Sequence, residues 1–108
     1  MEYTIEIRCG GISVYDRAGD RLPLWAGICG SNYLVADGNY DYERWSEAKL
    51  ALQILVAYGR QEGKDAIYIY VDTFNPRADR VSQDLIALGG IGETVDERFV
   101  RFTIPCDL

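Results

Sequence analysis

Residues 66–72, with the sequence AIYIYVD, are the most strand-like segment of this chain. β-Branched and aromatic side chains fit the surface of a pleated sheet, and this run consists largely of them. Both faces of such a strand would be apolar or aromatic. That pattern is typical of an interior strand that other elements cover on both faces. We therefore expect residues 66–72 near the middle of a sheet.

The segments around this strand predict a mixed sheet and two main helices. Strand patterns occupy residues 3–9, 12–15, 24–29 and 98–104, and residues 33–36 continue the third strand or add a fourth. Helical patterns occupy residues 42–59 and 76–88, and residues 93–97 form a polar loop. The order β-β-β(-β)-α-β-α-β predicts one α/β (α+β) domain over residues 1–108. Because strands joined through a helix are normally parallel neighbours, we expect an antiparallel N-terminal hairpin and parallel C-terminal strands.

The first predicted helix is apolar on two sides. Asp41 is a good N-cap for it, and one stripe of its wheel contains Trp45, Ala48, Leu52, Leu55, Val56 and Gly59. Leu50 and Ile54 lie nearly opposite that stripe. If one side covers the sheet, the other must meet a second element or a partner. Leu50 and Ile54 are therefore candidates for self-association, and a homodimer is one hypothesis.

Charge and cysteine content narrow the environment and the partners. The formal net charge is −6, from 17 acidic and 11 basic side chains, which disfavours direct contact with nucleic acid or an anionic membrane. The three cysteines, Cys9, Cys29 and Cys106, are odd in number and form no C-x-x-C motif, so neither a disulfide framework nor a zinc site is expected. Cys9 and Cys29 lie in apolar stretches and are expected to be buried. We predict a cytoplasmic protein, because there is neither a signal peptide nor a membrane span.

The sequence lacks the residues that several common chemistries need. It contains no histidine, which excludes Ser-His-Asp and Cys-His catalysis and histidine metal sites. It also has no G-x-x-x-x-G-K-[ST] and no G-x-G-x-x-G loop, while the glycines at 89, 90 and 92 follow a helix instead of opening one. We therefore predict no catalytic residue, no metal and no cofactor.

Part of the chain resembles the ribonuclease H-like fold. Gly10 and Gly11, the hairpin at residues 15–21 and the strand start at residues 24–27 are similar to that family's opening hairpin. Glu47 and Asp72 are similar to its helix glutamate and its strand-end aspartate. The family's first-strand aspartate is missing, since the matching stretch reads IEIRCG. The resemblance implies a metal-dependent nuclease using Glu47 and Asp72, and two-metal chemistry needs several convergent carboxylates.

A second resemblance is to the C-terminal half of GNAT acetyltransferases. It is carried by residues 59–63, 67–72, 75–78 and 88–91. The acetyl-CoA loop of that family is absent, because residues 39–44 read NYDYER, which is acidic and bulky where pyrophosphate needs bare amides. The usual tyrosine acid is replaced near Ser82 and Gln83. This resemblance implies a degenerate acetyltransferase. Both families share much the same element order, and fold alone does not give function.

The remaining feature is an acidic and aromatic segment at the start of the first helix. It contains Asp37, Tyr40, Asp41, Tyr42, Glu43 and Glu47, which we predict to bind a partner. Aromatics mixed with carboxylates suit a protein interface, and the carboxylates can stand where phosphates lie on a basic, nucleic-acid-binding protein. Packing on the sheet and favourable charge at the helix N-terminus explain the same residues without a partner.

The resulting hypothesis is a non-catalytic protein-binding module. Its sharpest form is a phage or mobile-element inhibitor of a nucleic-acid-handling defence complex, of the anti-CRISPR or anti-restriction type. The alternatives are a degenerate GNAT-like or ribonuclease H-like enzyme and a self-associating structural subunit.

Overall fold

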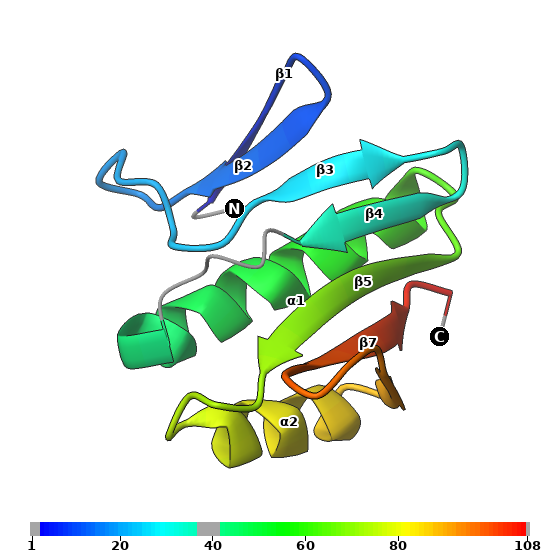
Figure 1. The fold of residues 1–108 in the computed structure, drawn as a ribbon. Helices are drawn as coiled ribbons and strands as arrows, with labels where there is room; N and C mark the ends of the chain where they lie inside the picture. The colour runs from blue at the N-terminus through cyan, green and yellow to red at the C-terminus, as the bar shows by residue number, and fades with distance from the viewer. Residues whose placement is uncertain (1–2, 37–41, 108) are drawn as a thin grey trace.

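A computed structural model describes residues 3–36 and 42–107, and its described strands form one sheet with two helices packed against it (Figure 1). The strands are β1 (Thr4–Arg8), β2 (Gly11–Tyr15), β3 (Ala26–Cys29), β4 (Tyr33–Ala36), β5 (Ala66–Asp72), β6 (Ile91–Thr94) and β7 (Phe99–Pro105). The helices are α1 (Trp45–Gln61), preceded by the 3₁₀ turn η1 (Tyr42–Arg44), and α2 (Ala78–Ala87). Across the sheet the strands are ordered β1-β2-β3-β4-β5-β7-β6, which confirms the predicted single mixed sheet.

The first four strands form an antiparallel meander, as expected for the N-terminal part. β1 and β2 pair from Thr4 opposite Tyr15 to Arg8 opposite Gly11, which leaves a two-residue turn. The two turn residues, Cys9 and Gly10, have φ angles of 49° and 80°. Two positive φ angles in a row match the right-handed twist of a tight hairpin, and glycine adopts them most easily.

The predicted parallel pairing of the C-terminal strands holds for one pair of strands only. β4 and β5 are parallel neighbours because α1 carries the chain back between them. β5 and β7, however, pair antiparallel over seven residue pairs, from Ala66 opposite Pro105 to Asp72 opposite Phe99. The reason is an additional strand. β6 follows α2 and turns directly into β7, so the chain reverses direction before it reaches β5.

β6 replaces part of the predicted polar loop at residues 93–97. Its four residues are all exposed, and glycines at positions 89, 90 and 92 hide the alternation that marks a strand. Gly92 packs closely on β7, because a Cβ there would lie 3.0 Å from the ring of Phe102. The strand is therefore defined by its pairing with β7 and by close packing on Phe102, and neither is visible as a local pattern.

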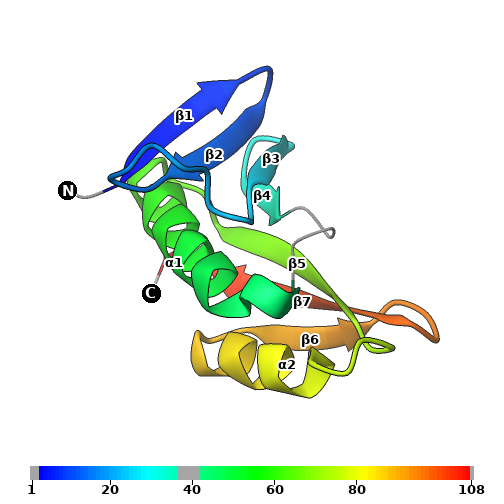
Figure 2. The ribbon, with the colours of Figure 1, turned by 90° about the vertical axis from the view of Figure 1, so that its left-hand side faces the viewer.

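Both helices lie on the same face of the sheet. Ile67, Ile69 and Val71 of β5 point toward that face and are fully buried, in the core that α1 and α2 complete. Figure 2 shows α1 and α2 next to each other. Tyr68 and Tyr70 alternate to the opposite face, are half-buried and, in the described part of the chain, have no helix over them. The expectation that β5 is covered on both faces was therefore wrong.

The cysteines are placed differently from the expectation. Cys9 and Cys29 are exposed, at the hairpin turn and at the end of β3, whereas Cys106 is fully buried. Cys106 packs against α1 at Gly59, where a Cβ would meet its sulfur at 2.7 Å. Burial raises the pKa of the Cys106 thiol, since the thiolate would lose its hydration. No helix in the described residues is both long and apolar enough to cross a membrane.

Candidate functional site

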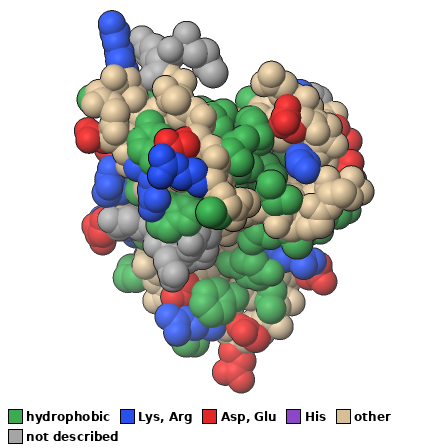
Figure 3. All heavy atoms as spheres, turned by 90° about the horizontal axis from the view of Figure 1, so that it is seen from above, with side chains coloured by type: hydrophobic (Ala, Val, Ile, Leu, Met, Phe, Trp, Pro, Cys, Tyr) green, Lys and Arg blue, Asp and Glu red, His purple; other side chains and the backbone are tan. Residues whose placement is uncertain are grey.

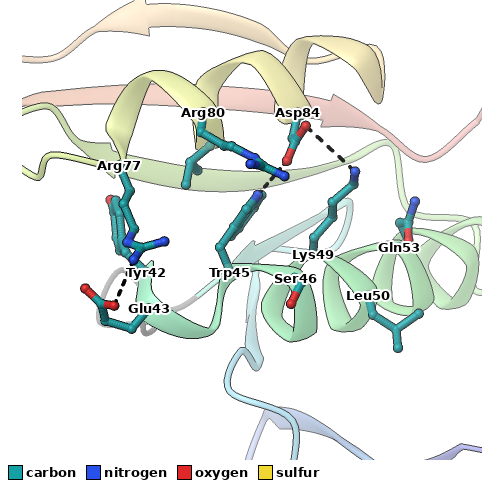
Figure 4. A pocket seen from close by; sticks show the side chains of 11 residues that line it. Tyr42, Glu43, Trp45, Ser46, Lys49, Leu50, Gln53, Arg77, Arg80 and Asp84 are labelled. Atoms are coloured by element: carbon teal, nitrogen blue, oxygen red, sulfur yellow. Dashed lines mark hydrogen bonds and ion pairs between the residues drawn. The ribbon is translucent and has the colours of Figure 1, made fainter.

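A groove of about 580 Å³ runs between α1 and α2 on the outer side of the helical layer (Figure 4). Its lining consists of Tyr42, Glu43, Trp45, Ser46, Lys49, Leu50, Gln53, Arg77, Arg80, Val81 and Asp84. The volume is within the range of ordinary ligand and peptide sites. Polar and charged side chains from both helices point into it, so it differs from a simple packing defect between two apolar surfaces.

Trp45 and Asp84 fix the distance between the two helices. The indole of Trp45 is only 6% exposed, and its Nε1–H donates a hydrogen bond of 2.8 Å to Asp84. A buried indole N–H needs such an acceptor, and a carboxylate gives a stronger bond than a neutral group. The ammonium of Lys49 lies 3.8 Å from the same carboxylate. Asp84 thus joins two residues of α1 to α2 and closes one end of the groove.

The charges of the groove are unusual for so acidic a chain. Glu43 and Arg77 form an ion pair of 3.0 Å at the opposite end. Arg80 lines the groove between these two ends and makes no ion pair with any described residue. The lining therefore contains three cations against two carboxylates, although the whole chain has a formal charge of −6. An anionic group entering the groove would meet an unpaired guanidinium.

The structure brings together some of the residues predicted to bind a partner. Asp37, Tyr40 and Asp41 lie outside the described residues. Tyr42 and Glu43 both line the groove, but Tyr42 is buried and its hydroxyl accepts a 2.7 Å hydrogen bond from the backbone N–H of Asp72. Its described role is thus to join η1 to the end of β5, whereas Glu43 is exposed at the rim.

Glu47, the last of the predicted partner-binding residues, lies outside the groove lining. It is half exposed on the outer surface of α1, and its carboxylate accepts a 2.6 Å hydrogen bond from Nε of Arg44. Ion pairs this exposed contribute little to stability, so Arg44 holds Glu47 only loosely. Glu47 is therefore available to a partner that approaches the rim from the η1 side.

The residues predicted for self-association are less exposed than expected. Leu50 and Ile54 are half-buried and pack against the hydrophobic core. Leu50 is also part of the groove lining. Two surfaces that the sequence suggested separately, the acidic segment and the second apolar stripe, thus meet at one groove.

Glu47 and Asp72, the residues of the enzyme alternative, are held in separate ion pairs. Asp72 binds the guanidinium of Arg98 through both oxygens, at 2.9 and 2.7 Å. This hydrogen bonding from Arg98 lowers the pKa of Asp72, although partial burial acts in the opposite direction. In the described ranges no group of three or more His, Cys, Asp or Glu side chains is placed to hold a metal ion. A metal-dependent nuclease that uses Glu47 and Asp72 stays a prediction.

Arg77, Arg80 and Asp84 are groove residues that the sequence analysis missed. Their spacing of three and four residues puts them on one side of α2, and Figure 4 shows all three pointing toward α1. The sequence analysis gave only the range of that helix and did not examine the pattern of its charged side chains. A search for polar stripes on the predicted helices would have found them.

A second hollow lies on the sheet face that has no helix. It is lined by Cys9, Gly10, Gly11, Trp25, Ala26, Gly27, Val35, Ala36 and Tyr70. None of these side chains is charged, and three of the lining residues are glycines. Figure 3, which views the molecule from the side of the β1–β2 hairpin, shows Lys and Arg side chains scattered among Asp and Glu instead of gathered into a single patch. The interhelical groove therefore remains the candidate site.

The assignment of the interhelical groove as the candidate site rests on the geometry of this structure. No protein-family model matches the chain, and no curated protein matches it.

Proposed function

We propose that this protein is a non-catalytic protein-binding module and that the groove between α1 and α2 is its binding site. The observation that carries the proposal is Arg80, a cation of the groove lining without an ion-pair partner among the described residues, between Glu43–Arg77 and Asp84. Arg80 is exposed, so its guanidinium is accessible to a partner. A guanidinium lining a groove is well suited to a carboxylate or backbone carbonyl of a partner, because it offers several donors in a fixed plane.

The chemistry of the groove fits a protein better than a nucleic acid. A phosphate backbone would have to approach Glu43 and Asp84 within a chain of net charge −6. A protein segment can present both signs of charge, together with an apolar side chain for Leu50. Arginine and aromatic side chains are also the residue types enriched where protein interfaces gain most of their affinity.

The narrower form of the proposal is an inhibitor of a nucleic-acid-handling defence complex, of the anti-CRISPR or anti-restriction type. It is supported by Glu43 at the rim and Glu47 on the adjoining surface of α1, which are exposed and form ion pairs with exposed arginines. Arginines of a partner's nucleic-acid-binding surface can replace these weak internal pairs at small cost. The two carboxylates would then occupy positions that phosphates take in the uninhibited complex.

The test is affinity capture from bacterial lysate at moderate salt, with partners identified by mass spectrometry. Three tagged variants are compared with the unchanged protein. Arg80→Glu reverses the unpaired groove cation and breaks no described ion pair, while Glu43→Lys combined with Glu47→Lys reverses the rim. Glu62→Lys is the matched control, because Glu62 is exposed at the far end of α1.

We expect a stoichiometric partner with the unchanged protein and with Glu62→Lys, and its loss with Arg80→Glu. Loss with the double rim variant and a nucleic-acid-binding partner would support the inhibitor form. A partner retained by all variants would move the binding site away from the groove. If nothing is captured by the unchanged protein, the binding-module proposal itself fails.

A further inference from the structure

The free edge of β6 is the second surface that needs an explanation. β6 is the last strand of the sheet, with β7 on one side and no strand of the described chain on the other. All four of its residues are exposed, and the large apolar side chains at and beside its ends, Ile91 and Val95, are 75% and 54% exposed. An exposed apolar edge strand presents unpaired backbone groups to any strand of matching register.

Backbone hydrogen bonds reveal which groups of β6 point outward. The N–H of Val95 donates to the carbonyl of Phe99 at 3.0 Å, which continues the β6–β7 register beyond Thr94 opposite Val100. In an antiparallel ladder, hydrogen-bonded pairs alternate with non-bonded ones. The N–H and C=O groups of Ile91 and Glu93 therefore point toward β7, as those of Val95 do. The N–H and C=O groups of Gly92 and Thr94 point to the free edge.

The other side of β7 supports this assignment. The N–H of Thr73 donates to the carbonyl of Arg98 at 2.7 Å, and the N–H of Cys106 donates to the carbonyl of Asp65 at 2.9 Å. Both bonds continue the β5–β7 register and use even-numbered residues of the β7 segment. Odd-numbered residues of β7, including Phe99, must then face β6, as the bond from Val95 requires.

The outward groups of this edge are complementary to themselves. If two copies of β6 run antiparallel with Glu93 at the centre, Gly92 of each copy lies opposite Thr94 of the other. These are the outward-pointing residues, so they form two mutually hydrogen-bonded pairs. In the same register Ile91 lies opposite Val95 of the second copy, at both ends, in the closely spaced non-bonded arrangement that favours side-chain contact.

We propose that a second copy of this chain pairs with the free edge of β6 and joins two sheets into one. A single register satisfies the outward backbone groups and covers both exposed apolar side chains. Because the two copies are related by a twofold axis, the assembly stops at a dimer and does not continue as an open chain. The contact extends over only about five residues of each strand, well below the area of a standard interface. A weak dimer follows, formed at high protein concentration.

Glu93 opposes this dimer and supplies an independent check on the register. At the centre of the pairing it lies opposite Glu93 of the second copy, and like charges directly opposite each other on neighbouring strands are destabilising. Each carboxylate is held by Arg101 of its own chain at 3.2 Å, which reduces the repulsion. Glu93→Gln and higher salt should therefore both strengthen the dimer.

The test is sedimentation velocity over a concentration series up to about 1 mM, the range in which so small a contact would be populated. Thr94→Pro is the diagnostic variant, because proline deletes the outward donor and leaves the hydrogen bonds between β6 and β7 in place. Thr94→Ala is the matched control, since it keeps the N–H. Circular dichroism and thermal unfolding of each variant establish that the sheet is intact.

We expect a concentration-dependent dimer in the unchanged protein and in Thr94→Ala, weakened at least about tenfold in Thr94→Pro by the loss of its backbone bonds. In Glu93→Gln the dimer should form at lower concentration. A monomer at every concentration, in both the unchanged protein and Glu93→Gln, would overturn the proposal. A dimer insensitive to Thr94→Pro but lost in Leu50→Asp would also overturn it and assign association to α1.

Discussion

Tyr42 shows how one side chain can have a structural role where the sequence suggested a recognition role. Its side chain is buried, and its hydroxyl accepts a hydrogen bond from the backbone N–H of Asp72 at the end of β5. The bond joins two segments 30 residues apart in the chain. An aromatic residue in an acidic loop looks the same in sequence whether its ring points inward or outward, so the sequence could not predict this contact.

Replacement of Tyr42 by Phe tests that role. The variant leaves the amide of Asp72 without its acceptor, so we expect the free energy of unfolding to fall by about 1–2 kcal/mol. Tyr58→Phe is the control, because its hydroxyl makes no hydrogen bond within the described part of the chain and should change stability by less than about 0.5 kcal/mol. Urea unfolding followed by tryptophan fluorescence measures both. Equal stability of the two variants would show that the 2.7 Å bond contributes nothing.

At the scale of elements, the close packing of α1 against the C-terminal end of β7 depends on Gly59. Glycine is ordinarily a poor helix residue, and alanine would be preferred by about 1 kcal/mol in an exposed helix. Here the helix meets Cys106 so closely that an added Cβ would lie 2.7 Å from its sulfur. The local helix propensity is therefore overruled by a contact between residues almost 50 positions apart in the chain.

Gly59→Ala should destabilise the protein by about 1–3 kcal/mol, because the core at this point has no room for a methyl group. Cys106→Ala should lose stability too, by leaving a small void. Combined, the two changes compensate, so the double variant should lose less than the sum of the single losses. Thermal unfolding of the four proteins measures the coupling. Strict additivity would mean that the helix moves away freely and that the close contact is unimportant.

The element boundaries show where sequence patterns suffice and where they fail. The predicted strand at residues 66–72 is confirmed to the residue, because β-branched and aromatic side chains, which favour strands, make up most of the run. The start of the second helix was predicted too early, since Asn75 caps the backbone N–H of Arg77 in a turn that precedes α2. β6 was missed because Gly92 interrupts its local pattern, and the packing of Gly92 against Phe102 is a contact between strands that the local sequence does not reveal.

The candidate site was predictable only in part for the same reason. Glu43 and Leu50 were selected from sequence and do line the groove. The pairing of Trp45 with Asp84, 39 residues away, is tertiary and could not be read locally. Neither could the unpaired state of Arg80, since it depends on which carboxylates the fold brings near.

For the whole molecule, stability in acid depends on carboxylates that the fold binds tightly. The pKa of Asp72 lies below its ordinary value because Arg98 binds both oxygens, and backbone N–H groups of Phe99 and Arg98 lower the pKa of Asp96. A carboxyl group whose pKa is depressed by folding stabilises the native state above its unfolded pKa of about 4. That contribution is lost as the pH falls through the lower, folded pKa.

Asp72→Asn should therefore reduce the dependence of the free energy of unfolding on pH below about pH 4. Part of the dependence remains, because Asp96 is unchanged. Arg98→Ala removes the cause of the shift and should flatten the same part of the curve. Denaturant unfolding at a series of pH values between neutral and strongly acidic measures this. If Asp72→Asn retains the full slope, the shift at Asp72 does not contribute to acid unfolding.

The pairing between β2 and β3 has a mechanical consequence. Their register contains two residue pairs, whereas β5 and β7 share seven. The β1–β2 hairpin is therefore attached to the rest of the molecule by few backbone hydrogen bonds, including those from Ile28 to Gly10 and from Leu22 to Val14, and by the side chains of Ile12 and Val14, which are almost completely buried. Apolar contacts give way over very short extensions. Under a pulling force the chain should first release this hairpin as a unit, while the strands around β5 keep their hydrogen bonds.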